Sequence, residues 1–440
     1  MRRTGLEVAL PAASGGDGAA AAGCPPRRVL HVLDGLSGGG AEEWVRDLVA
    51  LLPLGDFTFT VCYLFPNPGR FQYAAELQAL GARVAYVGLR DQWFAELAPR
   101  HPLVRFALRA VRSPYYRWIR PWARHLVMFA RLWREIRRTR PDVVHCHVFH
   151  AFVYGVLAAR AARVPLVVYT APALRAQLDG RYRWVFLAYR RLGRLVDRFV
   201  TAISVEELEQ EAGVPTDRII LLRGAVDFRR VRRVPRETNP VVREFGLAGA
   251  FPIILLAGRF SAEKGQAVAV RAARELRVTY PDLRLILLGE GEEREAIRAL
   301  VAAEGLEGTV ILPGFRTDLE HFYGLADLYW RTSLTEGMNR ACFLAMAYGL
   351  PIVAFDTRAP TEVLEDGETV LLVPSGDHAS LAAASRRLLA SPAWARAIGA
   401  AAAERCRRDW DIDRAIQTFA ELYRCGAPPR TRGRQRARES

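Results

Sequence analysis

Short apolar segments alternate with helical stretches twice along the chain, and this alternation limits the fold more than any other feature of the sequence. One set of strand-like segments lies between residues 29 and 226, and a second set lies between residues 252 and 375. Near-continuous apolar strands separated by helices are typical of parallel sheets that are covered on both faces. The sequence therefore predicts an α/β protein with two doubly wound Rossmann-like domains facing a central cleft.

The domain boundaries are predicted from changes in composition. The Ala- and Gly-rich start and the basic end of the chain are both expected to be disordered. A proline-flanked stretch after the first strand set indicates a linker. The predicted parts are a disordered segment (1–27), an N-terminal domain (28–230), a linker (231–240), a C-terminal domain (241–410), a closing helix (411–424) and a basic disordered tail (425–440).

Positive charge is concentrated in one internal segment. The chain carries 62 Lys+Arg against 47 Asp+Glu, a formal net charge of +15, and residues 100–140 hold twelve arginines with Glu135 as the one acid. Because aromatic residues are interleaved with these arginines, the segment 91–121 is predicted to bind an anionic membrane surface. Nucleic acid is the rival partner, and the prediction is that none binds.

The following residues, 122–138, are expected instead to form a helix that covers a sheet, because their apolar residues follow helical spacing. The expected core-facing residues are Trp122, Leu126, Phe129, Trp133 and Ile136. No apolar run reaches the roughly 18 residues of a membrane-spanning helix, and the start of the chain lacks the apolar region of a secretory signal. Six dispersed cysteines without a C-x-x-C pair indicate neither a zinc site nor disulfides. The prediction is a cytoplasmic protein, peripheral at the inner face of the cell membrane.

Two groups of residues follow strands of the first set. Gly38 to Gly40 come after the first strand and before a helix, so the backbone of Gly39 and Gly40 is expected to approach a phosphate. The fourth strand ends in His-Cys-His, which places His145 and His147 on one face. Metal binding is one interpretation of that pair, but two histidines at alternate positions of one strand seldom make a complete metal site. We predict no metal and a cleft-facing polar role for His147.

The second strand set carries the cationic residues. Its first strand leads to Arg259 and Lys264, and Lys264 is the only lysine of the chain. A single compact ammonium among so many guanidinium groups indicates a specific site, and the two cations together suit a diphosphate. Gly291 follows the next strand at a predicted close backbone approach. Glu336 and Gly337 stand at a later strand-to-helix turn, where the free N–H groups of Met338 and Asn339 are expected to hold an anion or sugar hydroxyls.

These motifs, in this order, resemble the retaining glycosyltransferases of family four, which have the GT-B fold. The resemblance rests on five stretches of sequence: GGGAE (38–42), HCH (145–147), AGRFSAEKG (257–265), GEG (289–291) and SLTEGMNRACFLAMAYGLPIVA (333–354). It implies that the C-terminal domain binds a nucleotide diphosphate-sugar donor and the N-terminal domain binds the acceptor. It also implies that the enzyme needs no cofactor, because two cations support the leaving diphosphate.

The resemblance assigns roles to individual residues. Arg259 and Lys264 would hold the diphosphate, and Gly40 would approach it from the other domain. Glu336 would contact the donor sugar, and His147 would meet a sugar hydroxyl near the reacting carbon. The family places a second glutamate on the nucleotide ribose, and this chain has Leu344 at that position.

The predicted function is retaining transfer of a sugar from the nucleotide diphosphate-sugar to a lipid-linked or polysaccharide acceptor at the inner membrane surface. Two alternatives remain open from the sequence. One is a degenerate, non-catalytic GT-B module that acts as a binding or assembly partner, which the leucine at 344 favours. The other is a nucleotide-sugar epimerase or phosphorylase on the same fold.

Overall fold

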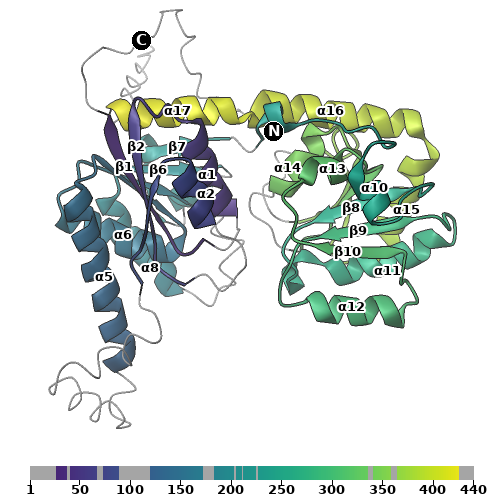
Figure 1. The fold of residues 1–440 in the computed structure, drawn as a ribbon, viewed down its shortest axis with the longest axis horizontal. Helices are drawn as coiled ribbons and strands as arrows, with labels where there is room; N and C mark the ends of the chain where they lie inside the picture. Colours follow the sequence, from purple (N-terminus) through teal and green to yellow (C-terminus); the bar gives the residue numbers. More distant parts are fainter. Residues whose placement is uncertain are drawn as a thin grey trace, which may run out of the picture.

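The computed structural model of the chain describes most of both strand sets. The described residues are 26–36, 40–66, 73–88, 119–171, 183–202, 205–210, 212–223, 226–334, 340–357 and 364–425. They form two α/β lobes, each built around a parallel sheet (Figure 1). The predicted class, two Rossmann-like α/β domains, is confirmed.

The first lobe contains a seven-stranded sheet in the order β3-β2-β1-β4-β5-β6-β7 among the described residues. Its strands are β1 (Arg27–Leu33), β2 (Phe57–Tyr63), β3 (Arg83–Tyr86), β4 (Val143–His147), β5 (Leu166–Thr170), β6 (Arg198–Thr201) and β7 (Ile219–Leu221). All of its strand pairs are parallel. The strand order reverses between β1 and β4, so the ends of these two strands mark the edge where ligands bind in such sheets.

Helices cover both faces of this sheet, which explains why its strands are apolar on both sides. The helices are α1 (Gly40–Leu51), α2 (Tyr73–Ala79), α5 (Ile119–Thr139), α6 (Phe149–Ala161), α8 (Arg183–Leu192) and α9 (Val205–Gln210). Apolar side chains of α5, α6 and α8 share one core with the sheet. Those of α1 and α2 share the core on the other face.

The helix predicted over 122–138 lies within α5, but its buried stripe differs from the prediction. The predicted Ile136 is buried, and the predicted Phe129 and Trp133 are partly buried against the same core. Met128 and Leu132 are buried as well, whereas the predicted Leu126 is 69% exposed. Residues four apart stand on one helix face, and the face that meets the sheet is that of Met128 rather than that of Leu126. The segment 91–121, which is predicted to bind a membrane surface, lies outside the described residues apart from the backbone that begins α5.

The second lobe contains a six-stranded sheet in the order β10-β9-β8-β11-β12-β13 among the described residues. Its strands are β8 (Ile253–Ala257), β9 (Arg284–Leu288), β10 (Val310–Gly314), β11 (Leu328–Arg331), β12 (Ile352–Asp356) and β13 (Leu371–Pro374). Its helices are α10 (Pro240–Glu244), α11 (Gln266–Arg277), α12 (Arg294–Ala303), α13 (Leu319–Tyr323), α14 (Arg340–Ala347), α15 (His378–Ala390) and α16 (Pro392–Trp410). The strand order reverses between β8 and β11. Lys264 lies in the loop after β8, and Arg331 is the last residue of β11.

The end of the chain crosses back to the first lobe. Helix α16 lies along the second lobe, and α17 (Ile412–Cys425) continues over the first (Figure 1). The backbone N–H of Ile412 donates to the carbonyl oxygen of Val226 at 3.0 Å, and Phe419 and Tyr423 are fully buried in the core of the first sheet. The last helix is therefore part of the first lobe's core. None of the described helices has the length and apolar character needed to cross a bilayer.

Candidate functional site

The loop after β8 is tied to the loop after β11. The Thr332 hydroxyl donates to the carbonyl oxygen of Lys264 at 2.8 Å, and the Leu334 N–H donates to that of Glu263 at 2.7 Å. Gly265 has φ 67°, and a Cβ there would lie 2.2 Å from the carbonyl oxygen of Thr332. Only glycine fits this approach, so the position of Lys264 is fixed by backbone contacts.

A second glycine holds the neighbouring loop. At Gly291 an added Cβ would lie 2.2 Å from the carbonyl oxygen of Phe260. Loop packing alone therefore requires glycine at this position. The approach of Gly291 to a donor stays a prediction.

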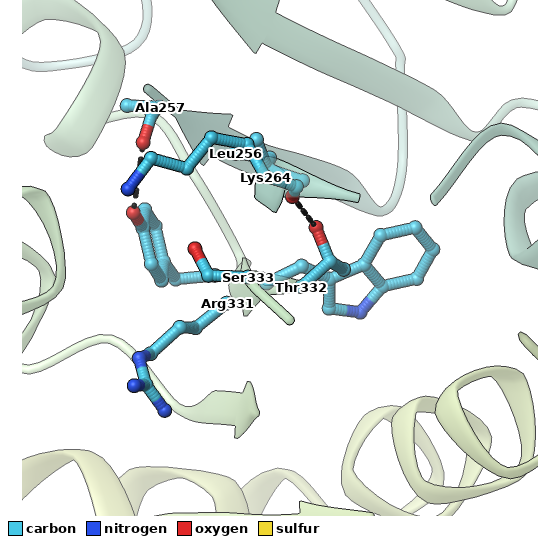
Figure 2. Close-up of a pocket in the computed structure, with 8 residues that line it drawn as sticks. Leu256, Ala257, Lys264, Arg331, Thr332 and Ser333 are labelled. Carbon is cyan, nitrogen blue, oxygen red and sulfur yellow. Dashed lines mark hydrogen bonds between the residues drawn. The ribbon is translucent and has the colours of Figure 1, made fainter. Parts of the chain in front are cut away.

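The two predicted diphosphate ligands lie at the same loop but in different environments. The Arg259 side chain is 63% exposed and pairs with Glu263 at 2.9 Å. Burial alone would raise the pKa of Glu263. Hydrogen bonds, the one from Arg259 among them, outweigh burial and lower this pKa below its usual value. Lys264 is half-buried and lines a cavity of about 10 Å³, about the minimum that admits one water, at the ends of β8 and β11 (Figure 2).

A third cation lines the same cavity, and the sequence analysis missed it. Arg331, the last residue of β11, is 7% exposed. Its guanidinium donates to the carbonyl oxygen of Phe355 at 3.3 Å and to the Thr357 hydroxyl at 3.1 Å. The signal was an arginine at the end of an otherwise apolar strand. Together with Lys264 it makes the carboxyl edge of this sheet cationic.

The remaining second-lobe residues of the prediction come just before α14 in the sequence or belong to that helix. Glu336, Gly337, Met338 and Asn339 lie outside the described residues, as does Gly39 in the first lobe. Their roles stay predictions. Leu344 is partly buried and packs against the apolar core of the second lobe.

An ion pair joins the first residue of α14 to α1 of the other lobe. The Arg340 guanidinium lies 2.5 Å from one carboxylate oxygen of Asp47 and 3.4 Å from Glu43. Burial raises the pKa of Asp47, but Arg340 and Arg46 outweigh it and lower this pKa below its usual value. Gly40 begins α1, and a Cβ there would lie 3.9 Å from the Arg340 side chain. The two helices that follow the predicted donor-binding segments therefore begin next to each other.

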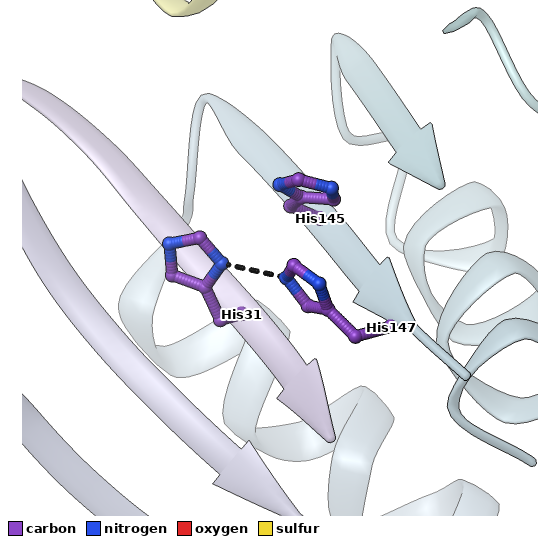
Figure 3. Close-up of side chains that lie close together, drawn as sticks. All are labelled: His31, His145 and His147. Atoms are coloured by element: carbon purple, nitrogen blue, oxygen red, sulfur yellow. Dashed lines mark hydrogen bonds between the residues drawn. The ribbon is translucent and has the colours of Figure 1, made fainter. Parts of the chain in front are cut away.

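Three buried histidines lie together at the ends of β1 and β4. His31 stands opposite His145 in the strand register, and the His31 Nδ1 lies 3.0 Å from the His147 Nε2 (Figure 3). Each of the three side chains is at most 1% exposed. The sequence analysis singled out His145 and His147 but missed His31, which lies on a strand more than a hundred residues away.

His145 ties this cluster to the last helix. Its Nδ1 lies 2.6 Å from the Tyr423 hydroxyl of α17, and its Nε2 lies 2.7 Å from the Thr170 hydroxyl of β5. Both ring nitrogens therefore have partners. The histidine cluster is thus covered by a helix that enters from the second lobe.

The predicted orientation of His147 is wrong. Its ring turns toward His31 under the cover of the neighbouring elements instead of facing a cleft, and it is 1% exposed. The other nitrogen, Nδ1, is buried without a hydrogen-bond partner. The contact of His147 with a donor sugar stays a prediction.

Among the described side chains, the histidine cluster is also the one group of three potential metal ligands that lie close enough together to share an ion. The ligand atoms of the three residues lie within 4.8 Å of one another. Both ring nitrogens of His145 already have partners, so an ion bound by all three residues would have to replace one of the two hydrogen bonds of His145. Since the hydrogen bonds of the cluster already use four of the six ring nitrogens, we interpret the cluster as a hydrogen-bonded part of the core.

Comparison with known proteins identifies both lobes. Residues 38–230 match the family described as Glycosyltransferase Family 4, and residues 241–405 match Glycosyl transferases group 1. The D-inositol 3-phosphate glycosyltransferase of Pseudarthrobacter chlorophenolicus is 30% identical over 64% of this chain and 71% of its own length. A lipopolysaccharide core biosynthesis glycosyltransferase of Rhizobium meliloti, LpsD, is 31% identical over 46% of this chain and 57% of its own.

A solved structure shares the whole architecture. HepE from Anabaena, crystallised with UDP and glucose, superposes with a TM-score of 0.73 and covers 91% of this chain and 100% of its own. The two sequences are 19% identical, so the likeness concerns the fold.

The buried histidines predict how stability depends on pH. Burial lowers the pKa of His31 to about 3 and holds those of His145 and His147 well below the usual value. Below about pH 6.5 the unfolded chain takes up protons that the folded chain does not, so the free energy of unfolding falls. Each such histidine lowers the free energy of unfolding by about 1.4 kcal/mol as the pH falls from 7.5 to 5.5. His150, whose pKa is raised by the hydrogen bond that it donates to Asp34, offsets part of this loss.

Urea unfolding at these two pH values measures the effect. His31→Gln should reduce the loss by about 1.4 kcal/mol, the contribution of one buried histidine. Equal stability of the wild type at both pH values would show that the folded protein accepts these protons.

Proposed function

Since the chain belongs to the family 4 glycosyltransferases and has their GT-B fold, we propose that it transfers a sugar, with retention of configuration, from a nucleotide diphosphate-sugar to a lipid-linked or polysaccharide acceptor at the inner membrane surface. Sugar transfer follows from family membership. The mechanism, the acceptor and the place of action are the parts that we propose.

One observation supports the donor site most strongly. The only lysine of the chain lies at the carboxyl edge of the second sheet, held by backbone contacts, with Arg331 in the same cavity and Arg259 at the same loop. A diphosphate leaving group gains negative charge as its bond to the sugar breaks, and cations placed beforehand stabilise that charge. HepE, which has the same fold, binds UDP, and this makes a uridine nucleotide the first donor class to test.

In the proposed reaction the acceptor hydroxyl attacks the donor sugar from the face that the diphosphate leaves. An oxygen of the departing phosphate takes the hydroxyl proton, so this step uses no protein base. Lys264 and Arg259 would offset the charge on the diphosphate during the step. Front-face attack of this kind gives retention of configuration.

The acceptor and the membrane rest on separate arguments. LpsD, a relative of this chain, is named for lipopolysaccharide core biosynthesis, which supports an acceptor linked to a lipid or polysaccharide. The membrane contact rests on the arginines and aromatic residues of 91–121. If it is correct, the protein co-sediments with phosphatidylglycerol vesicles at low salt and is released at high salt, because salt screens the attraction. Equal binding to phosphatidylcholine vesicles, or binding to neither, would contradict it.

Lys264→Ala tests the donor site. We expect UDP to bind about tenfold or more weakly to this variant, because a hydrogen bond to a charged group contributes about 1.5 to 3 kcal/mol. Lys264→Arg should also be impaired, since a planar guanidinium replaces a compact ammonium. Isothermal titration calorimetry measures the dissociation constants, and Arg298→Ala, which removes an exposed cation of α12, serves as the matched control. Equal affinity of Lys264→Ala and wild type would remove Lys264 from the site.

Leu344→Glu tests whether position 344 faces the nucleotide ribose. If this position faces the ribose, as the resemblance implies, the new carboxylate accepts ribose hydroxyls and tightens UDP binding by about 1 to 3 kcal/mol. Because Leu344 is only partly buried, the melting temperature should change little. Leu344→Gln is the uncharged control. A lower melting temperature without tighter binding would show that position 344 does not face the ribose in this chain.

A further inference from the structure

His150 is held by a carboxylate at the carboxyl edge of the first sheet. It is the second residue of α6, and Asp34 directly follows β1. The His150 Nδ1 lies 2.8 Å from one oxygen of Asp34, and the other oxygen accepts the N–H of Ala151 at 2.7 Å. A carboxylate that accepts from Nδ1 fixes the proton of a neutral imidazole on that nitrogen. The Nε2 atom of His150 is then a hydrogen-bond acceptor.

The ring of His150 is open to solvent and flanked by aromatic side chains. Its side chain is 53% exposed, and none of the described residues pairs with its Nε2. The ring of Phe65 meets it edge to face at 5.2 Å, and that of Phe149 does so at 5.8 Å. Both phenylalanines are partly exposed. The Phe65 N–H donates to the carbonyl oxygen of Asp34 at 2.8 Å, so the backbone holds this arrangement together.

The group lies at the carboxyl edge of the first sheet, in the lobe that the family resemblance assigns to the acceptor. Asp34 stands shortly before Gly40, the start of the helix that Arg340 ties to the other lobe. His150 is three residues beyond His147, at the switch between β1 and β4. In sheets of this type, ligands bind at such a switch.

We propose that Asp34, His150 and Phe65 form an acceptor subsite for a sugar, in which Nε2 of His150 accepts a hydrogen bond from a sugar hydroxyl. Phe65 provides an apolar surface for the C–H face of the sugar ring. Asp34 positions the imidazole and does not touch the sugar. The carboxylate beside the ring disfavours a phosphate, so the group recognised is a saccharide hydroxyl and not a lipid phosphate. The inference rests on the proposed function and narrows its acceptor.

The subsite has a characteristic dependence on pH. The hydrogen bond that His150 donates to Asp34 raises the pKa of His150 above its usual value, and Asp34 is the charged group that acts on this ring among the described residues. A protonated imidazole has no acceptor nitrogen. Binding of a sugar hydroxyl therefore weakens as the pH falls through this raised pKa.

The test uses the full chain saturated with UDP and a panel of methyl glycosides (glucoside, galactoside and mannoside). Saturation-transfer NMR at pH 8 should show binding of at least one glycoside to the wild type. His150→Ala should weaken it about three- to tenfold, the effect of one lost hydrogen bond. His150→Gln should restore part of the binding and lose its dependence on pH between 5.5 and 8. Asp34→Asn should move the midpoint of that dependence to lower pH.

The matched control is His378→Ala, because His378 also pairs with a carboxylate, that of Glu275 at 3.1 Å, but in the second lobe. Glycoside binding should be unchanged in this variant. Binding of no glycoside to the wild type, or equal binding to the wild type and His150→Ala, would overturn the proposal. So would glycerol phosphate binding that depends on His150. If the wild type does not bind UDP, the result contradicts the donor site instead. The failure of the acceptor subsite and the failure of the donor site are therefore distinguishable.

Discussion

The ion pair between Arg340 and Asp47 sets how the two lobes meet. Its atoms are 2.5 Å apart, and the two side chains are only 16% and 9% exposed. If one partner were removed, the other would be an unpaired charge largely shielded from water. Removing either side chain therefore destabilises the protein. Glu43 and Arg46 lie against the same pair and complete the balance of charge. The pair therefore favours the arrangement in which the starts of α1 and α14 lie together.

The crossing of the chain at α16 and α17 gives the lobes a second connection. Trp410, at the end of α16, stacks on Phe343 of α14 with ring centroids 4.0 Å apart. Two residues later α17 begins, and its Tyr423 reaches His145 in the first sheet. The histidine cluster beneath the first lobe's carboxyl edge thus depends on a helix whose approach is fixed in the second lobe. Together, the ion pair and this helix connect the two lobes at two places.

The fold could be predicted because its signal is local. Each apolar segment indicates its own strand, and the loops with Arg259 and Lys264 directly follow one. Contacts between distant segments could not be predicted in this way. Arg340 and Asp47 are 293 residues apart, and His31 meets the His145 motif only through the pairing of β1 with β4. The orientation of His147 was mispredicted because the surroundings that bury its ring, and the partner it turns to, come from other parts of the chain.

The central claim is that the cationic edge of the second sheet binds a nucleotide diphosphate-sugar. A thermal-shift measurement with UDP-, GDP- and ADP-sugars tests it most directly, because a ligand that binds only the folded state raises its stability, by about 2.7 kcal/mol at a hundred times its dissociation constant. The account predicts that one nucleotide class raises the melting temperature and that the rise is lost when Arg259 and Lys264 are both replaced by alanine. No rise with any of the three classes, or the same rise in the double variant, would contradict it.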